Sequence, residues 1–403
     1  MPIINKVKSK IPKLRFQGFE GEWEEKKLEV ISIFQNGKAH EEDVVENGEY
    51  IIVNSKFIST NGEIKKYTNY AHSLLNSDTV VLVMSDVPNG KALAKCYYIE
   101  TENKYSLNQR ICSIKGVGVK TKYLYYKLNR NPYYIEFDNG VGQTNLRKDD
   151  VLNCPVQFPT NELEQQKIAD FLTSVDERID SLSRKKELLE QYKKGVMQKV
   201  FSQKLRFKQT DGSDFPDWEE KRLGELVKVL KGSNLSKNDL NDNGTEECVL
   251  YGELFTKYKI FTNKIISRTN VVSGARSLAG DILMPTSDVT PQGLATSTAI
   301  MKSNVLLGGD INILRPSIKI NSIFLSYILN NNKKSIMELV SGTTIKHIYS
   351  KDIQKLKISL PHFDEQQKIT DFITALDEQI DQVNQQIQKT KTFKKALLQQ
   401  MFV

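Results

Sequence analysis

The sequence lacks most of the features that identify membrane proteins and secreted proteins. No apolar run approaches the roughly 18 residues that a transmembrane helix needs, and residues 1–6 show neither the apolar core nor the cleavage site of a signal peptide. Cysteine is scarce, and no two cysteines have Cys-x-x-Cys spacing: Cys96, Cys112, Cys154 and Cys248. This pattern argues against a disulfide framework and a zinc ribbon. We therefore expect a cytoplasmic protein without membrane association.

The motifs of catalysis and cofactor binding are also missing. Asn131-Pro132-Tyr133-Tyr134 is close to the Asn-Pro-Pro-Tyr signature of adenine methyltransferases, but it lacks the second proline and no glycine-rich cofactor loop precedes it. We expect a simple turn there. The acidic residues of Pro216–Lys221 lie too close together to share a nuclease metal, and no Gly-x-x-x-x-Gly-Lys-Ser/Thr loop for ATP exists. The histidines are few and scattered: His40, His72, His347 and His362. The sequence thus predicts no catalytic residue, no metal site and no cofactor in this chain.

An internal duplication organises the chain. The segment Glu164-Gln165-Gln166-Lys167-Ile168 recurs 201 residues later, and 12 of the 17 positions from 164 to 180 are identical to those from 365 to 381. The segments Lys13–Phe16 and Trp23–Leu28 recur as Lys204–Phe207 and Trp218–Leu223. Each half is therefore a variable block followed by a shared segment. We predict a first block at 1–157, a central long helix at 158–203, a second block at 204–360 and a C-terminal long helix at 361–403.

The shared segments have the heptad pattern of a coiled coil. Their apolar positions alternate in steps of four and three residues over about five heptads. The predicted helix–helix seam consists of Ile168, Leu172, Val175, Ile179, Leu182, Leu189, Val196, Ile369, Ile373, Leu376, Ile380, Val383, Ile387 and Leu397. Lys186, Lys193, Thr390 and Lys394 interrupt it, and we expect them to weaken it. The simpler alternative is that each helix packs only on its own block. We favour antiparallel pairing, because it makes full use of a spacer about 60 Å long.

The two blocks share a sparse framework and differ elsewhere. Strand-like runs occupy 49–53, 79–84, 109–114, 281–284 and 310–314, and helical spacing occurs at 122–129 and 322–329. Ser85-Asp86 matches Ser287-Asp288, and Gly142 and Thr144 match Gly342 and Thr344. The expected fold class is α+β, with two mixed α/β domains separated by two long helices that form an antiparallel coiled coil.

The order of these motifs resembles that of the specificity subunits of type I restriction–modification systems. The resemblance rests on the Pro12 to Trp23 opening, the Glu-Gln-Gln-Lys-Ile helix starts and the Met197–Phe201 helix end, and it extends from about Pro12 to Phe402. It implies a non-catalytic subunit in which each block is a target-recognition domain that reads half of a bipartite, asymmetric site in double-stranded DNA. It also implies that the paired helices set the gap between the half-sites and dock two modification (methyltransferase) subunits. Restriction/translocase subunits complete the complex, and S-adenosylmethionine, ATP and Mg are expected on the partner subunits.

Polar loops are the candidates for DNA contact, because Lys and Arg bind phosphates while Arg, Lys, Asn and Gln reach base edges. The net charge of +8 permits a polyanionic partner without predicting one. The candidates are Lys56, Asn61, Lys65, Lys66, Tyr67, Asn89, Lys91, Gln143, Thr144, Asn145, Arg147, Lys231, Asn234, Arg276, Gln292, Thr343, Thr344, Lys346 and His347. Segments 143–147 and 343–347 are favoured, since they occupy equivalent positions and differ in sequence. Two alternatives stay open: a coiled-coil adaptor whose blocks bind proteins, and a self-contained methyltransferase.

Overall fold

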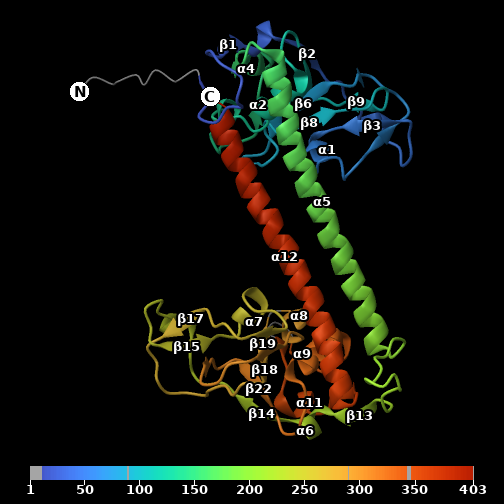
Figure 1. Cartoon of the computed structure of the whole chain (residues 1–403), viewed down its shortest axis with the longest axis vertical. Helices are drawn as coiled ribbons and strands as arrows, with labels where there is room; N and C mark the ends of the chain where they lie inside the picture. Colours follow the sequence, from blue (N-terminus) through green and yellow to red (C-terminus); the bar gives the residue numbers. More distant parts are fainter. Residues whose placement is uncertain (1–10, 89, 289, 343–345, 403) are drawn as a thin grey trace, which may run out of the picture. The chain divides into compact units, whose positions relative to one another are not determined.

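The chain divides into two compact units, and each unit takes segments from both halves of the sequence. The computed structural model describes residues 11–88, 90–288, 290–342 and 346–402. Unit 1 comprises Met1–Arg184 and Asn384–Val403, and unit 2 comprises Lys185–Val383. Each unit holds one globular block and one section of each of the two long helices, α5 (Glu162–Phe201) and α12 (Phe363–Met401) (Figure 1).

The block of unit 1 is built on a sheet whose central strand is buried on both faces. Alternate residues of that strand enter two different cores: Val80 and Leu82 join the cluster around Trp23, whereas Val81 and Val83 join the cluster around Phe57. The main sheet has the order β2 (Ser32–Asn36), β10 (Ile111–Gly116), β6 (Thr79–Val83) and β8 (Cys96–Ile99). A smaller sheet has the order β4 (Tyr67–Thr68), β3 (Tyr50–Val53), β9 (Tyr105–Leu107) and β5 (Leu74–Leu75). The remaining elements are β1 (Glu24–Lys27) paired with β12 (Pro155–Phe158), and helices α1 (Ser55–Ser59), α2 (Thr121–Leu128), α3 (Pro132–Ile135) and α4 (Lys148–Leu152).

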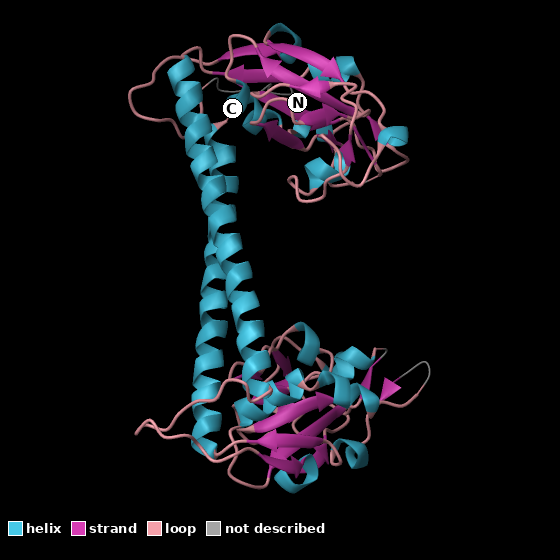
Figure 2. Ribbon diagram, turned by 90° about the vertical axis from the view of Figure 1, so that its right-hand side faces the viewer, coloured by secondary structure: helices cyan, strands magenta, loops and turns pink. Residues whose placement is uncertain are grey.

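The block of unit 2 repeats this plan, with one more strand in its main sheet and one fewer in its second sheet. Its main sheet has the order β14 (Val227–Lys231), β22 (Ile311–Pro316), β18 (Asp281–Pro285), β20 (Thr298–Ile300) and β16 (Phe261–Thr262). Its second sheet has the order β17 (Ser267–Thr269), β15 (Glu246–Val249) and β21 (Leu306–Leu307). The remaining elements are β13 (Glu219–Arg222) paired with β24 (Lys357–Leu360), and helices α6 (Leu223–Leu226), α7 (Glu253–Thr256), α8 (Pro291–Leu294), α9 (Ser322–Asn331), α10 (Lys333–Glu338) and α11 (Ser350–Ile353). In both units the strands form sheets with short helices packed against them (Figure 2). The α+β class is confirmed.

The central long helix begins four residues later than the predicted 158, at Glu162. The strands and helices predicted within the two blocks agree with these bounds to within about two residues, with one exception. The turn expected at Asn131–Tyr134 is the short helix α3. The Asn131 side chain accepts a hydrogen bond from the Tyr133 backbone N–H and so caps this helix. Tyr134 is fully buried, and its hydroxyl donates to the Val151 carbonyl oxygen. The expectation of a turn was wrong because Asn-Pro is also a favourable start for a helix.

The repeated sequence motifs fasten each block to the start of its long helix. In unit 1 the guanidinium of Arg15 donates to both carboxylate oxygens of the buried Glu164, at 2.7 and 2.8 Å. In unit 2 Arg206 makes the same pair of bonds to Glu365, both at 2.8 Å. These hydrogen bonds raise the pKa of both arginines, so both guanidinium groups stay charged. The Leu-Arg-Phe and Glu-Gln-Gln-Lys-Ile motifs therefore recur together because they bind each other.

Gln165 and Gln366, which directly follow these two glutamates in the chain, also fasten each block to its long helix. Gln165 accepts a hydrogen bond from the Lys120 backbone N–H and donates to the Pro159 carbonyl oxygen. Gln366 accepts from the Asn321 N–H and donates to the Pro361 carbonyl oxygen. Each glutamine therefore joins a long helix to the loop before a short helix of its block.

Within each unit the two long helices run antiparallel. In unit 1 Leu397 and Met401, near the end of α12, share a core with Ile168 and Leu172, near the start of α5. In unit 2 Val196 belongs to the end of α5 and lies in the core that contains the start of α12. Of the predicted seam residues, Ile179 and Leu189 are half-buried and the others are buried. Antiparallel pairing is confirmed, and the alternative of helices that pack only on their own blocks is wrong.

Candidate nucleic-acid interface

A short antiparallel ladder occupies the same place in both blocks. In unit 1 β7 (Ser85–Asp86) pairs with β11 (Thr144–Asn145), with Asn145 opposite Ser85. In unit 2 β19 (Ser287–Asp288) pairs with β23 (Lys346–His347), with His347 opposite Ser287. We call these the two reading ladders. The predicted equivalence of segments 143–147 and 343–347 thus holds for the residues that the structure describes, while Thr343 and Thr344 lie outside them.

The aspartate of each ladder organises the loop that follows it. Asp86 accepts hydrogen bonds from the backbone N–H groups of Val87, Ala92 and Leu93 at 2.7–3.1 Å. A Cβ on Gly90 would lie 2.1 Å from an Asp86 carboxylate oxygen, and a Cβ on Gly293 would lie 1.5 Å from one of Asp288. The matching Ser-Asp and Gly positions are therefore a shared frame, in which glycine leaves room for the carboxylate.

The unit 1 ladder presents two side-chain amides. Gln143 Nε2 donates to Ser85 Oγ, and Ser85 Oγ donates to Asn145 Oδ1, both at 2.7 Å. Gln143, Asn145 and Arg147 are exposed, whereas Thr144 is buried and donates to Asp138 Oδ1. The structure therefore places Thr144 in the frame, away from the surface where a base could be contacted. The prediction treated the whole loop as accessible, but alternate residues of a paired strand face opposite sides.

The unit 2 ladder presents different groups on the same frame. The His347 backbone exchanges two hydrogen bonds with Ser341, at 2.8 and 3.0 Å, which fixes the base of the loop. The His347 ring stacks on the exposed Tyr349 ring at 6.2 Å between centroids. Lys346 Nζ donates to the Gly342 carbonyl oxygen at 2.7 Å. Unit 2 therefore offers a cation and an imidazole where unit 1 offers carboxamides.

Of the other unit 1 candidates, Lys91 lies in the loop that Asp86 of the reading ladder holds, whereas Lys56, Lys65, Lys66, Tyr67 and Asn61 are more distant from the ladder in the chain. Lys56 is exposed on α1, and Lys65, Lys66 and Lys91 are exposed in loops, while Asn89 lies outside the described residues. Tyr67 packs against the core around Phe57, so its ring supports the smaller sheet. Asn61 lines a cavity of about 550 Å³ together with Asp176, Glu177 and Asp180. Lys95, Lys122 and Lys394 line the same cavity, so the carboxylates do not exclude a phosphate there and Asn61 stays a prediction.

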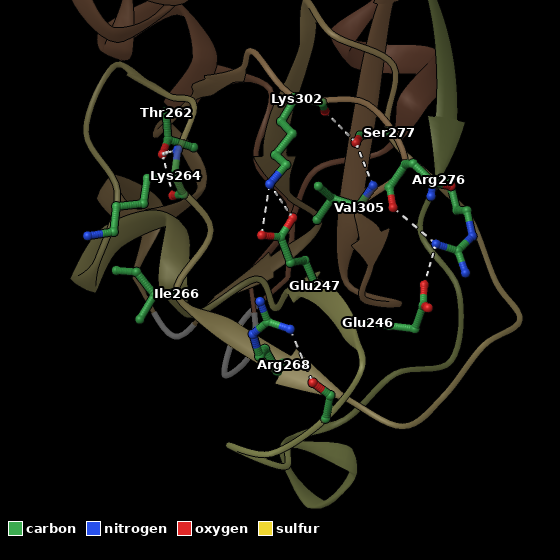
Figure 3. A network of polar contacts seen from close by, with 12 residues as sticks. Glu246, Glu247, Thr262, Lys264, Ile266, Arg268, Arg276, Ser277, Lys302 and Val305 are labelled. Carbon is green, nitrogen blue, oxygen red and sulfur yellow. Dashed lines mark hydrogen bonds and ion pairs between the residues drawn. The ribbon is translucent and has the colours of Figure 1, made fainter.

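In unit 2 Arg276 is committed to structural contacts. Its guanidinium pairs with Glu246 at 2.8 Å and donates to the Val272 and Asn304 carbonyl oxygens (Figure 3). The neighbouring Lys302 pairs with Glu247 at 2.7 Å. These cations are neutralised by adjacent carboxylates, so this part of the surface attracts phosphates weakly.

The remaining unit 2 candidates are accessible. Lys231 and Gln292 are exposed. Asn234 is exposed at the rim of a cavity of about 920 Å³ that Lys237 and Lys257 also line. Gln292 lies on α8, which contacts both strands of the unit 2 ladder, whereas Lys231 ends β14 and Asn234 lies in the loop after it. All three stay predictions.

Two polar clusters were not anticipated from the sequence. In unit 1 Asp176 of α5 pairs with Lys394 of α12 and accepts a hydrogen bond from the Tyr126 hydroxyl of α2 at 3.1 Å. We call this group clamp 1. In unit 2 Asp377 of α12 pairs with Lys193 of α5 and accepts from the Tyr327 hydroxyl of α9 at 2.6 Å; this is clamp 2.

Both clamps are partly buried. Lys193 and Lys394 were expected to weaken the seam, but each is held by a carboxylate on the opposite helix, and its side chain is at most 20% exposed. Each ammonium also lies 5.5 Å from the centroid of the tyrosine ring of its clamp. The signal that could have revealed them is the 201-residue offset, which relates Tyr126 to Tyr327 as well as Asp176 to Asp377.

Potential metal ligands do not gather in the described part of the chain. Within it, no group of three or more His, Cys, Asp or Glu side chains is placed to hold a metal ion. The four cysteines are free and buried. No helix among the described residues is long and apolar enough to cross a membrane.

Two blocks of one fold, each with a different polar surface on a common frame, define a duplicated recognition protein, and comparison with known families agrees. The model of the type I restriction modification DNA specificity domain matches residues 20–191 and 216–392. The chain therefore belongs to this family and contains two copies of its domain.

Individual relatives support the assignment. The MjaX protein of Methanocaldococcus jannaschii carries the name of a type I restriction enzyme specificity subunit. It is 26% identical over 296 residues, which cover 68% of this chain and 66% of the relative. The MjaVIII specificity subunit of the same organism is 26% identical over 297 residues, 67% of each chain. The chain thus matches about two thirds of the length of these relatives. The crystal structure of the type I restriction–modification S subunit from M. genitalium has the same fold: TM-score 0.64, 18% identity, with 98% of this chain and 99% of that chain covered.

Proposed function

We propose that this chain is the DNA-reading subunit of a type I restriction–modification complex. Each block reads one half of a bipartite, asymmetric site in double-stranded DNA, and the two long helices set the gap between the half-sites and dock two modification subunits. The single observation that carries the proposal is the pair of reading ladders, because one frame holds amides in unit 1 and a lysine and a histidine in unit 2. A protein that reads two different sequences needs this combination of constant backbone and changed side chains.

The chemistry of the ladders differs as two half-sites would require. The carboxamides of Gln143 and Asn145 match the donor–acceptor edge that adenine presents in the major groove. Lys346 and His347 offer donors that match the acceptors of guanine. We therefore propose that adenine contacts dominate in the half-site of unit 1 and guanine contacts in that of unit 2.

The chain itself is non-catalytic in this proposal. Partner subunits bind S-adenosylmethionine and transfer the methyl group, and further restriction/translocase subunits use ATP and Mg for cleavage. Support comes from the membership of the specificity family and from the sequence, which carries neither a glycine-rich cofactor loop nor an ATP loop.

Methylation mapping tests the proposal. DNA from cells that express this chain with its modification subunit should carry an asymmetric, bipartite methylated motif that disappears when this chain is omitted. Exchange of residues 13–157 for the block of another family member should change one half-site only. A stable complex without any motif would favour the alternative of a coiled-coil adaptor, and a change of both half-sites would contradict independent reading by the two blocks.

Substitutions on the ladders refine the test. Replacement of Asn145 by alanine should weaken binding of the cognate duplex about 5- to 150-fold, as expected for the loss of one good base contact worth about 1–3 kcal/mol. It should relax specificity in one half-site, whereas His347→Ala should relax the other. The exposed amide of Gln17, far from the ladder in the chain, is the matched control, and Gln17→Ala should leave affinity unchanged.

A further inference from the structure

The clamps place charged pairs at a seam that is mostly apolar. Asp176 and Asp377 each join three elements, because each lies on one long helix and contacts the lysine of the other long helix and a tyrosine of the block. The seam residues around them, such as Leu172, Val175, Ile373 and Leu376, are buried and apolar. A charged pair in such surroundings is costly to separate, because neither partner regains full hydration.

Both clamps require the same register of the two helices. Asp176 and Lys193 are 17 residues apart on α5, and Asp377 and Lys394 are 17 residues apart on α12. In an antiparallel pair, equal separations mean that one axial alignment satisfies both ion pairs. The apolar seam alone does not fix that alignment, because a slip by one heptad brings apolar positions opposite apolar positions again.

Slipped alignments would leave the clamp residues without their partners. A slip of seven residues in either direction would place Lys394 opposite Ala169 or Ser183, and Lys193 opposite Thr370 or Asn384. Neither lysine would then face a carboxylate. Asp176 would face Ile387 or Met401, so the slip would also bury a carboxylate against an apolar side chain.

We infer that the two clamps are register locks, which fix the axial alignment of the long helices and thereby the gap between the two half-sites. The four clamp residues and their tyrosines are positioning residues that touch no DNA in this inference. The tyrosines add a second restraint, since each hydroxyl fastens the block to the aspartate that is paired with the opposite helix. The statement about the half-sites rests on the proposed function, whereas the statement about register does not.

Spin-label distances test the register directly. Ser183 and Gln388 are exposed positions on α5 and α12 within unit 1, and cysteines introduced there can be labelled selectively because the four native cysteines are buried. A slip of one heptad moves one helix by about 10 Å along the other. In a chain with unmodified clamps, the two labels should give a single narrow distance by pulsed electron–electron double resonance.

The decisive variant replaces both clamps with apolar residues of similar size: Asp176→Leu, Asp377→Leu, Lys193→Met and Lys394→Met. We expect it to stay folded and to show a broadened or second distance. The double variant Asp176→Asn and Asp377→Asn is milder, keeps the tyrosine hydrogen bonds, and should broaden the distribution less. It keeps the inference testable if the apolar variant does not fold.

Two further variants separate register from general stability. Exchange of charges within each clamp (Asp176→Lys with Lys394→Asp, and Asp377→Lys with Lys193→Asp) should restore the single distance. Lys186 is the matched control, because among the described residues this seam lysine forms its ion pair with Glu190 of its own helix, and Lys186→Met should change nothing.

The recognised DNA sequence provides the second readout. With the apolar variant, methylation mapping should reveal the same two half-sites at more than one gap, whereas the charge-exchanged variant should keep the original gap. A single unchanged distance in both the apolar variant and the Asn variant would overturn the inference. If the unmodified chain directs no methylation at all, the proposed function fails, and the distance measurements still decide the register.

Discussion

The buried Arg206–Glu365 pair should contribute more to the stability of unit 2 than any exposed ion pair. Glu365 is fully buried and accepts hydrogen bonds from two guanidinium nitrogens and from the Trp218 indole N–H. Substitution of Glu365 by glutamine removes the negative charge and keeps the shape of the side chain. Arg206 then retains its positive charge without this counter-ion. The loss of one partner of a buried pair costs about 3–5 kcal/mol. We expect about 3 kcal/mol, the low end, because the Arg206 side chain is 22% exposed and water can reach it.

The two tryptophans allow the unfolding of each unit to be measured separately. Trp23 belongs to unit 1 and Trp218 to unit 2, and the chain has no others. In a Trp23→Phe background, fluorescence follows the urea unfolding of unit 2 alone. Glu365→Gln should lower its midpoint by about 1 M, from a loss of about 3 kcal/mol and a slope of about 3 kcal/mol per M.

Two control variants in unit 2 test whether burial of the pair accounts for the effect. Glu220 pairs with Lys357 on the surface, with both side chains more than 60% exposed, and Glu220→Gln should shift the midpoint little. Joint replacement of Arg206 by Met and Glu365 by Leu should cost less than Glu365→Gln alone, since no charge is left unpaired. A loss below about 1 kcal/mol for Glu365→Gln, or equal losses for Glu365→Gln and Glu220→Gln, would refute the reasoning.

Three further predictions concern single side chains. Burial raises the pKa of the Cys154 and Cys248 thiols to about 11, so both should react with iodoacetamide at pH 8 only after urea unfolds the chain; rapid reaction of the native protein would contradict their burial. Partial desolvation and the nearby Asp176 raise the pKa of Asp180, so its charged form weakens unit 1 at neutral pH. Asp180→Asn should therefore raise the thermal midpoint at pH 7, and the gain should vanish below about pH 3, where aspartate is protonated in the folded and unfolded states alike. Gly90→Ala should displace the loop held by Asp86 and weaken DNA binding in gel-shift titrations, whereas alanine at Gly195, a helical position of α5 with open space around it, should not.

The long helices could be predicted because their signal is periodic and repeated. The heptad pattern fixes which face of each helix is apolar, and the 201-residue repeat shows that both copies have the same face. Antiparallel pairing followed from that symmetry. The strands were found for a similar reason, since runs such as Thr79–Val83 are apolar on both faces and belong in the centre of a sheet.

The candidate interface was predicted less well, because polarity does not report orientation. Thr144 and Tyr67 are polar enough for a surface loop, yet pairing with a neighbouring strand turns Thr144 inward, and the Tyr67 ring packs on the core. Arg276 has a typical DNA-contacting side chain, but its partner Glu246 lies 30 residues earlier in the chain. Contacts between distant residues such as Asp176 and Lys394 follow from the tertiary fold, and a single sequence does not contain them as a local pattern.

Each unit contains a section of both long helices, and this arrangement has a consequence for protein synthesis. The core of unit 1 includes Leu397 and Met401, and the Phe402 ring packs on Tyr123 at 5.5 Å between centroids. A ribosome has therefore made the first block, the whole first helix and all of the second block before the side chains that complete the first core leave the exit tunnel. Until then the apolar face of α2 is open to chaperones. A chain that stops before residue 384 exposes this face permanently, which gives proteases a means to distinguish such copies from chains that carry the end of α12.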